Sequence, residues 1–371
     1  MDRIPLTRPA FTDRELMAIG RVLKTGFVSQ GPEVALFEQE VADFLGGGLA
    51  VAVSSGSAAI YVALRAVGVG RGDQVIVPAF SHPAPAYAVV MAGGIPVPVD
   101  TDPQTLSLDL DKVPSALTSM TKAVIIVDGL GAQAPVQKLR GILGNRPVSI
   151  IEDAACGLGM PDVGKYADIA TFSLHPRKVI TSGEGGFVFT HDAVLAESSR
   201  KIRNFGLKKK GFGPIFDDFG FNFRFNDILA AVARVQLSRL PEMREKRGRL
   251  VADYLNLLHG VDSIDVPKGL QTDVQAFQTM AVQTPVPGPE LVDIMSKRGV
   301  EVSATAHNLA EQPFFMDLWS KMSMQFQCPI AQQLARYLVA LPLGVSMTRD
   351  QVDIVVNELK EAVYESTRGS N

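Results

Sequence analysis

The feature that most constrains the fold of this chain is an alternation of short apolar runs with helical patterns between about residues 50 and 200. Strands of a parallel sheet are buried on both faces and are joined by crossover helices, so this alternation is typical of β-α-β units. The apolar runs that we interpret as strands are residues 49–53, 74–77, 96–99, 123–127, 148–151, 169–172 and 186–190. The sequence therefore predicts a large, mainly parallel α/β domain.

Helical patterns flank this region on both sides. Apolar residues recur at helical spacing in residues 13–25 and 33–45, and Gly31-Pro32 interrupts the chain between them. A long, highly charged helix is expected at residues 226–257, followed by a smaller α+β segment. Because 371 residues exceed what one compact core usually supports, we predict a large domain at residues 1–245 and a small C-terminal α+β domain at residues 246–371.

The overall composition excludes several classes of function. A formal net charge of −3 gives no reason to expect nucleic acid or an anionic membrane as a partner. The longest apolar runs are too short to cross a bilayer, and the first residues lack the apolar core of a signal peptide. Two cysteines and five scattered histidines predict neither a disulfide framework nor a metal site. We expect a cytoplasmic enzyme.

Open α/β sheets bind ligands where their strands end, and polar residues follow three of the predicted strands. Gly56 and Ser57 lie in a run of small residues at the start of a helix, whose free N–H groups could bind an anion or simply be capped by serine. Glu152 and Asp153 end another strand and point to opposite faces, so one of them can reach a site; a solvated strand end is the alternative.

The third segment carries a lysine between two strands. Lys178 follows Ser173 and precedes a glycine-rich turn at residues 182–186. A lysine held there can be partly desolvated and act as an amine nucleophile, although a surface turn has the same composition. An anion site, an acid and a lysine on one scaffold are what pyridoxal phosphate needs for its phosphate, its ring nitrogen and its aldehyde.

These residues belong to a longer series of motifs, at residues 4–6, 25–32, 55–59, 72–80, 152–155, 173–178, 220–224 and 341–343. In this order they resemble the DegT/DnrJ/EryC1/StrS family of sugar aminotransferases, within the fold-type I pyridoxal-phosphate enzymes, over nearly the whole chain. The resemblance implies that Lys178 holds the cofactor and moves the substrate proton, and that Asp153 pairs with the pyridinium nitrogen. It also implies that Gly56, Ser57 and Ser173 hold the phosphate.

The same resemblance implies a homodimer with shared active sites, because Asn222 matches the family residue that reaches the cofactor phosphate of the neighbouring subunit. Two positions depart from the family pattern. His82 stands where an aromatic residue commonly stacks on the pyridine ring, and a flat imidazole can still stack there. Cys156 stands where Gln or His commonly contacts the phenolic oxygen, and a thiol is a poor donor; a small buried hydrophobe is the other interpretation of this residue.

The implied reaction moves an amino group from a small-molecule donor, glutamate, to a keto sugar that is nucleotide-linked. Relatives that dehydrate a keto sugar resemble this family with the lysine replaced by histidine, so Lys178 favours transamination. A regulatory protein that keeps the fold without the chemistry is a second alternative. A third is an NAD-dependent oxidoreductase, because residues 129–134 fit a G-x-G-x-x-A pattern followed by an acid about twenty residues later. That pattern explains few residues of the chain, and we reject it.

Overall fold

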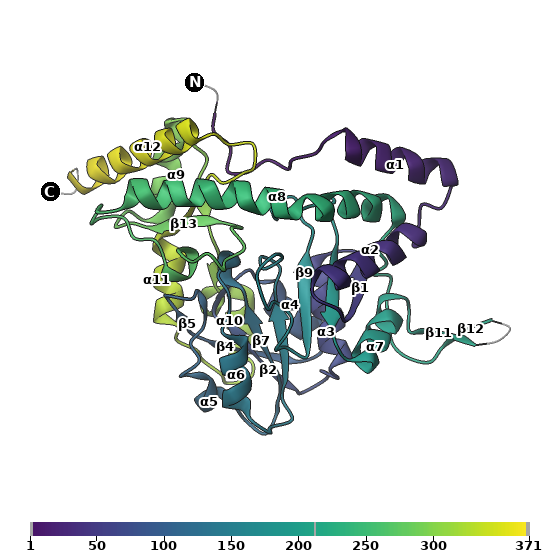
Figure 1. The fold of residues 1–371 in the computed structure, drawn as a ribbon. Coiled ribbons are helices and arrows are strands. Elements are labelled where there is room, and N and C mark those ends of the chain that lie inside the picture. Colours follow the sequence, from purple (N-terminus) through teal and green to yellow (C-terminus); the bar gives the residue numbers. More distant parts are fainter. Residues whose placement is uncertain (1–2, 211–212, 369–371) are drawn as a thin grey trace.

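The computed structural model describes residues 3–210 and 213–368. At its centre is a seven-stranded sheet in the order β1-β10-β9-β8-β7-β2-β4 (Figure 1). Its strands are β1 (Leu49–Val53), β2 (Gln74–Pro78), β4 (Ile95–Val99), β7 (Thr121–Val127), β8 (Ser149–Asp153), β9 (Ile169–Ser173) and β10 (Gly186–Thr190). All seven predicted strands are therefore present, within one or two residues of the predicted bounds.

The pairing of the strands follows from their connections. The pairs β4-β2, β2-β7, β7-β8 and β8-β9 are parallel, whereas β10 is antiparallel to both β9 and β1. Residues 174–185 between β9 and β10 contain no helix, and the Leu174 N–H donates to the Gly185 carbonyl at 2.9 Å. A connection without a crossover helix returns the chain antiparallel. The segment with Lys178 is thus a hairpin-like loop at the carboxyl end of β9.

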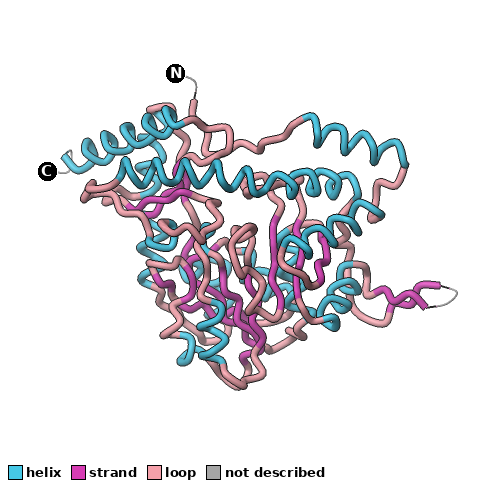
Figure 2. The backbone as a smooth tube through the Cα atoms, in the orientation of Figure 1, coloured by secondary structure: helices cyan, strands magenta, loops and turns pink. Residues whose placement is uncertain are grey.

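Helices cover both faces of the sheet, as expected for strands that are apolar on both sides. Alternate strand residues such as Val51, Ile125 and Ile151 share a core with α3 (Gly56–Ala66), α4 (Ala84–Met91) and α7 (Ala193–Arg203). The intervening residues pack against α2 (Pro32–Phe44), α6 (Val136–Leu143) and α8 (Asp227–Leu258) on the other face. Figure 2 shows the strands enclosed by these helices. The predicted α/β fold is confirmed.

The C-terminal part is a smaller α+β assembly. Its sheet has the order β13 (Met280–Gln283), β16 (Leu338–Leu341) and β14 (Ser303–Ala304), all antiparallel. The helices around it are α9 (Gly288–Lys297), α11 (Pro329–Tyr337) and α12 (Arg349–Arg368), whereas α10 (Pro313–Ser320) packs in the core that contains α3 and α4. Ile4 forms a bridge with Val300 and is buried in this C-terminal core. The division at residues 245 and 246 falls inside α8, which contributes to both cores, and it stays a prediction.

The remaining elements are short or peripheral. Helix α1 (Asp13–Thr25) has the predicted bounds, begins at a capping box of Thr12 with Glu15, and packs on α8. The others are β3 (Phe80–Ser81), β5 (Thr101–Asp102), β6 (Ser107–Leu108), α5 (Val113–Ala116), β11 (Leu207–Lys210), β12 (Gly213–Phe216), β15 (His307–Asn308) and three 3₁₀ turns at Gly129–Gly131, Lys268–Leu270 and Leu309–Glu311. Across the described ranges, no helix has the length and apolar character needed to span a membrane.

Candidate active site

A cavity of about 320 Å³ lies at the carboxyl ends of β7, β8 and β9, where an open α/β sheet is expected to bind its ligand. Residues that directly follow or end these strands line it, among them Asp128, Asp153 and Ser173. The opposite side is lined by residues of the C-terminal part, including Gln278, Thr279 and residues 303–306. The cavity therefore has a sheet wall, formed by the strand ends with the start of α3 and the lysine loop, and a C-terminal wall, formed by residues 278–341.

The start of α3 and the end of β9 form an anion-binding cradle. Ser55 caps α3 by accepting a hydrogen bond from the Ala58 N–H at 3.1 Å. A Cβ added at Gly56 would lie 2.8 Å from the Cβ of Ser173, so only glycine allows this approach. Gly56, Ser57 and Ser173 all line the cavity, and the first N–H groups of a helix favour an anion. The predicted phosphate residues thus lie together.

The two adjacent acids of β8 point to opposite faces of the sheet. Glu152 accepts the Gly164 N–H at 2.8 Å and does not line the cavity. Asp153 lines it and accepts hydrogen bonds from the Ala155 N–H at 3.2 Å and from the Thr171 hydroxyl at 3.4 Å. Burial raises the pKa of Asp153, and the Lys178 ammonium partly opposes this shift. A cationic ligand atom at this position would stabilise the ionised carboxylate further.

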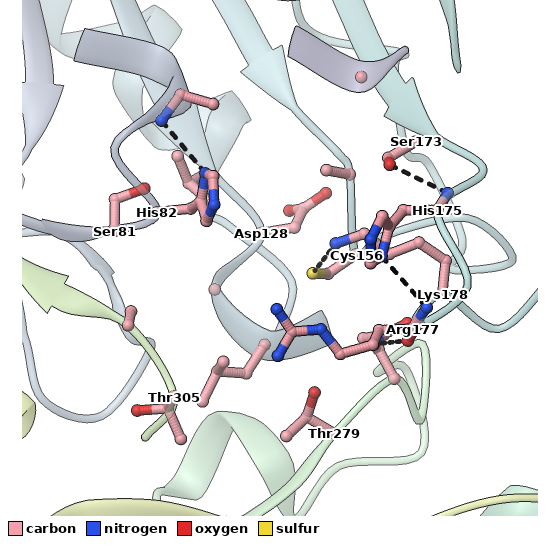
Figure 3. Close-up of a pocket in the computed structure, with 18 of the residues that line it drawn as sticks. Ser81, His82, Asp128, Cys156, Ser173, His175, Arg177, Lys178, Thr279 and Thr305 are labelled. Carbon is pink, nitrogen blue, oxygen red and sulfur yellow. Dashed lines mark hydrogen bonds between the residues drawn. The ribbon is translucent and has the colours of Figure 1, made fainter. Parts of the chain in front are cut away.

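Lys178 lies in the loop between β9 and β10, and its side chain enters the cavity (Figure 3). Its N–H donates to the His175 carbonyl at 2.9 Å, and Thr181 fixes the loop by donating its hydroxyl to the Leu174 carbonyl at 2.7 Å. The Lys178 Nζ donates to the Cys156 Sγ at 3.2 Å. Cys156 is half-buried, forms no disulfide and lines the same cavity. The nucleophile candidate is therefore half-buried in a fixed loop.

His82 follows β3 and lines the cavity beside its mouth. Its Nδ1 accepts the Ala84 N–H at 3.2 Å. Burial lowers the pKa of His82, and the cations of Lys178 and Arg177 lower it further, so the ring is neutral at pH 7. A flat, neutral imidazole has the shape needed to cover an aromatic ring. His307, in the strand β15 that pairs with β3, is exposed and is not part of the cavity lining.

Asn222 lies outside the cavity lining of its own protomer. It is exposed, bridges to Asn204, and accepts the Arg224 N–H through Oδ1 at 3.5 Å. The next residue, Phe223, accepts the Ser54 N–H through its carbonyl at 2.9 Å, which ties this segment to the loop before α3. The shared-site role of Asn222 remains a prediction, since it concerns a second subunit.

Sequence reasoning assigned no role to Asp128 or Arg177, which both line the cavity. Asp128 follows β7 directly, its N–H donates to the Asp153 carbonyl at 3.1 Å, and its Oδ1 accepts the Ala134 N–H at 2.9 Å. Its buried Oδ2 has no hydrogen-bond partner in the described part of the chain. Burial and the neighbouring Glu152 raise the pKa of Asp128 well above its usual range, which favours the protonated carboxyl. Its place at a strand end was the sequence signal that could have identified it.

Arg177 precedes Lys178 and also lines the cavity.

The glycine pattern after β7 has a structural reason of its own. Gly129–Gly131 forms a 3₁₀ turn, and α6 begins only at Val136. A Cβ added at Gly129 would lie 2.2 Å from the Leu106 carbonyl oxygen, so close backbone packing requires glycine there. These glycines therefore do not open a helix toward a ligand, as those of a dinucleotide-binding loop would. This agrees with our rejection of the oxidoreductase alternative.

Comparisons with known proteins agree with this geometry. The model of the DegT/DnrJ/EryC1/StrS aminotransferase family matches residues 9–360. A dTDP-4-dehydro-2,3,6-trideoxy-D-glucose 4-aminotransferase from Saccharopolyspora spinosa is 30% identical over 97% of both chains. The crystal structure of S. venezuelae DesV with a ketimine intermediate is 30% identical, covers 97% of this chain and 98% of its own, and has a TM-score of 0.88.

A putative sugar aminotransferase from Streptococcus pneumoniae has the same fold at 22% identity, with a TM-score of 0.93 and 99% of each chain covered, and it has been solved in pyridoxal-phosphate and pyridoxamine-phosphate forms. The cavity of the present chain fits that cofactor: the Gly56–Ser173 cradle accommodates a phosphate, Asp153 is placed for a ring cation, and Lys178 supplies an amine. The chain belongs to the DegT/DnrJ/EryC1/StrS aminotransferase family and is a pyridoxal-phosphate-dependent aminotransferase.

Proposed function

We propose that the protein is a cytoplasmic, homodimeric sugar aminotransferase that takes an amino group from glutamate and gives it to a nucleotide-linked keto sugar. The observation that carries the proposal is that Lys178, Asp153 and the start of α3 open into one cavity. The curated relative from Saccharopolyspora spinosa, named for a dTDP-linked 4-keto sugar, supports this acceptor class.

Each residue of the sheet wall has a distinct task. Bound pyridoxal phosphate supplies an aldehyde that captures amines and a ring that accepts electrons. Lys178 holds the cofactor and, when released, its Nζ accepts and returns the proton at the substrate carbon. The Asp153 carboxylate keeps the ring nitrogen protonated, and Gly56, Ser57 and Ser173 bind the phosphate. His82 packs against the ring face.

An absorbance spectrum tests the donor half of the proposal. The purified protein with pyridoxal phosphate should show the visible band of the lysine-bound cofactor, and glutamate should convert it to the shorter-wavelength band of the pyridoxamine form. A visible band that glutamate leaves unchanged would reject glutamate as the donor. Absence of any visible band would reject cofactor attachment itself.

The proposed dimer with shared sites is supported by the surroundings of Asn222. Phe219 and Phe221 are 59% and 57% exposed, and Phe205 lies 6.1 Å from Phe221 between ring centroids. Exposed aromatic side chains grouped in this way are typical of a protein interface. Asn222 therefore sits within a surface suited to a second copy of the chain.

Mixing two inactive variants tests this sharing. In the proposed dimer, each site combines Lys178 of one subunit with Asn222 of the other. A dimer of one Lys178→Ala subunit and one Asn222→Ala subunit would therefore contain one site with both native residues. We expect up to about a quarter of the native activity after the subunits are exchanged, if half of the dimers are mixed and each has one working site of two. No recovery in verified mixed dimers would reject the shared-site proposal, and two Lys178→Ala preparations mixed together are the control.

A further inference from the structure

Arg177 has a cationic side chain that faces the cavity without a partner. Its guanidinium forms no ion pair or hydrogen bond with any residue in the ranges 3–210 and 213–368 for which the structure gives contacts. Figure 3 shows this side chain extending from the lysine loop across the cavity toward Thr305, above Thr279. The Arg177 backbone is fixed, because its carbonyl accepts the Gln278 Nε2–H at 2.6 Å. The fixed backbone thus holds an exposed guanidinium at the wall of the cavity.

The charges around Arg177 leave its positive charge uncompensated. Asp153 is buried beside Lys178, and burial favours the protonated form of Asp128. Glu184 also lines the cavity and its charge raises the pKa of His175 against the lowering effect of burial, but it forms no ion pair with Arg177. Lys178 and Arg177 both line this side of the cavity and place two cationic side chains there. An anionic ligand group would be stabilised there.

The cofactor phosphate is not that group, because its cradle lies elsewhere in the cavity. Gly56, Ser57 and Ser173 form the cradle at the start of α3. In Figure 3, His175 and Lys178 lie between Ser173 and Arg177. The guanidinium therefore faces the space in which a substrate, and not the cofactor phosphate, would lie.

We propose that Arg177 binds the α-carboxylate of the amino donor and so determines which amines the enzyme accepts. The inference rests on the proposed function, in which the donor is an amino acid. The donor amine must react where Lys178 is attached, and its carboxylate is bonded to the same carbon that carries the amine. Arg177 is the residue next to Lys178, and a guanidinium fork matches a carboxylate in two parallel hydrogen bonds. The diphosphate of a sugar nucleotide is separated from the reacting carbon by the sugar ring, so it would lie farther from Lys178.

The test removes the proposed contact in two ways, by changing Arg177 and by changing the α-carboxylate of the donor. The cofactor-loaded protein is mixed rapidly with L-glutamate or with L-isoglutamine, in which the α-carboxylate is an amide, and decay of the visible band is followed. We expect Arg177→Gln to lower the second-order rate constant for glutamate by about 10- to 100-fold, the usual effect of losing a hydrogen-bonded charge. The rate constant for isoglutamine should be low already and nearly unchanged by the substitution. Arg177→Lys, which keeps the charge and loses the fork, should give an intermediate value.

A binding measurement provides a second readout. The dissociation constant of 2-oxoglutarate, which cannot react with the aldehyde form of the cofactor, should rise at least about tenfold in Arg177→Gln. Cofactor affinity and the position of the visible band should not change. Arg249→Gln on the exposed side of α8 is the matched control, because Arg249 is 73% exposed and pairs only with Glu245 within its helix.

The outcomes separate the two proposals. In the first case, glutamate makes the visible band of the wild type decay, but Arg177→Gln leaves this rate unchanged or slows the reactions of glutamate and isoglutamine equally. The inference is then overturned, while the donor proposal stands. A defect confined to the half-reaction with the keto sugar also overturns it, since Arg177 would then contact the acceptor. If no amino acid reduces the band in the wild type, the donor proposal fails and the inference fails with it.

Discussion

The sheet wall and the C-terminal wall of the cavity are built in different ways. On the sheet wall, Asp153 and Ser173 end strands whose register is fixed by the parallel ladder, and the lysine loop is closed by hydrogen bonds between its own residues. On the C-terminal wall, the Ser303 hydroxyl donates to the carbonyl of the next residue, Ala304, and the Thr305 hydroxyl donates to the Leu338 carbonyl at 3.2 Å. A rigid wall suits bond-making chemistry, whereas a wall of short strands and hydroxyls suits selection of a substrate.

The comparison predicts its largest effect at Lys178. Lys178→Ala removes the amine that contacts Cys156 and acts on Asp153, so both covalent attachment of the cofactor and turnover should be lost. Folding should survive, because the loop is held by backbone and threonine hydrogen bonds that do not involve the lysine side chain. Loss of the visible band with an unchanged circular dichroism spectrum checks this expectation. Undiminished turnover would contradict the mechanism.

Asp153 should show the next largest effect. Asp153→Asn keeps the shape of the side chain and its hydrogen bond from Ala155, but removes the negative charge that faces the cavity. We expect kcat to fall about 100- to 1,000-fold, the usual loss when a preorganised electrostatic partner is removed, while the cofactor stays attached to Lys178. Steady-state kinetics and the visible band measure the two effects separately. A variant with native kcat would show that the sheet wall does not control the ring nitrogen.

Much of the sheet wall was predictable from sequence because its signals are local. A strand buried on both faces is a continuous apolar run; Asp153 ends one such strand, and Lys178 lies in the loop after another. The C-terminal wall gave no comparable signal, because Thr279 and Thr305 adjoin strands of four and two residues that are far apart in the chain. Asp128 had the signal of a strand end, but sequence reasoning considered only the glycine pattern after it, and rejected that pattern as a nucleotide loop. The role of Asn222 in a second subunit stays a prediction, because the structure describes a single subunit.

Glu152 provides a control on the same strand as Asp153. Its pKa is raised from 4.5 to about 7 by burial, so the native state binds a proton more tightly than the unfolded state does. Below pH 4.5 both states are protonated and the residue has no pH-dependent effect; between pH 4.5 and 7 it increasingly destabilises the native state, and above pH 7 the effect is constant. Glu152→Gln removes this destabilisation and keeps an oxygen that accepts the Gly164 N–H.

The variant should therefore be more stable than the wild type at pH 8, by on the order of 3 kcal/mol, and the difference should shrink toward pH 5. Urea unfolding at the two pH values measures it. Because Glu152 faces away from the cavity, kcat should stay close to native. A large loss of activity would show that the two faces of β8 are not functionally separate.

Thr279 tests the C-terminal wall, where we expect the smallest effect. Its side chain lines the cavity, is half-buried and faces the Arg177 guanidinium from the opposite side (Figure 3). Thr279→Val keeps the shape and removes the hydroxyl, so a lost hydrogen bond to a substrate should raise KM by no more than about tenfold. Neither cofactor attachment nor the rate of the first half-reaction at saturating donor should change, since no residue of the sheet wall bonds to this hydroxyl. A large fall in kcat with unaltered KM would instead mean that the C-terminal wall takes part in the chemistry, and the contrast between the two walls would fail.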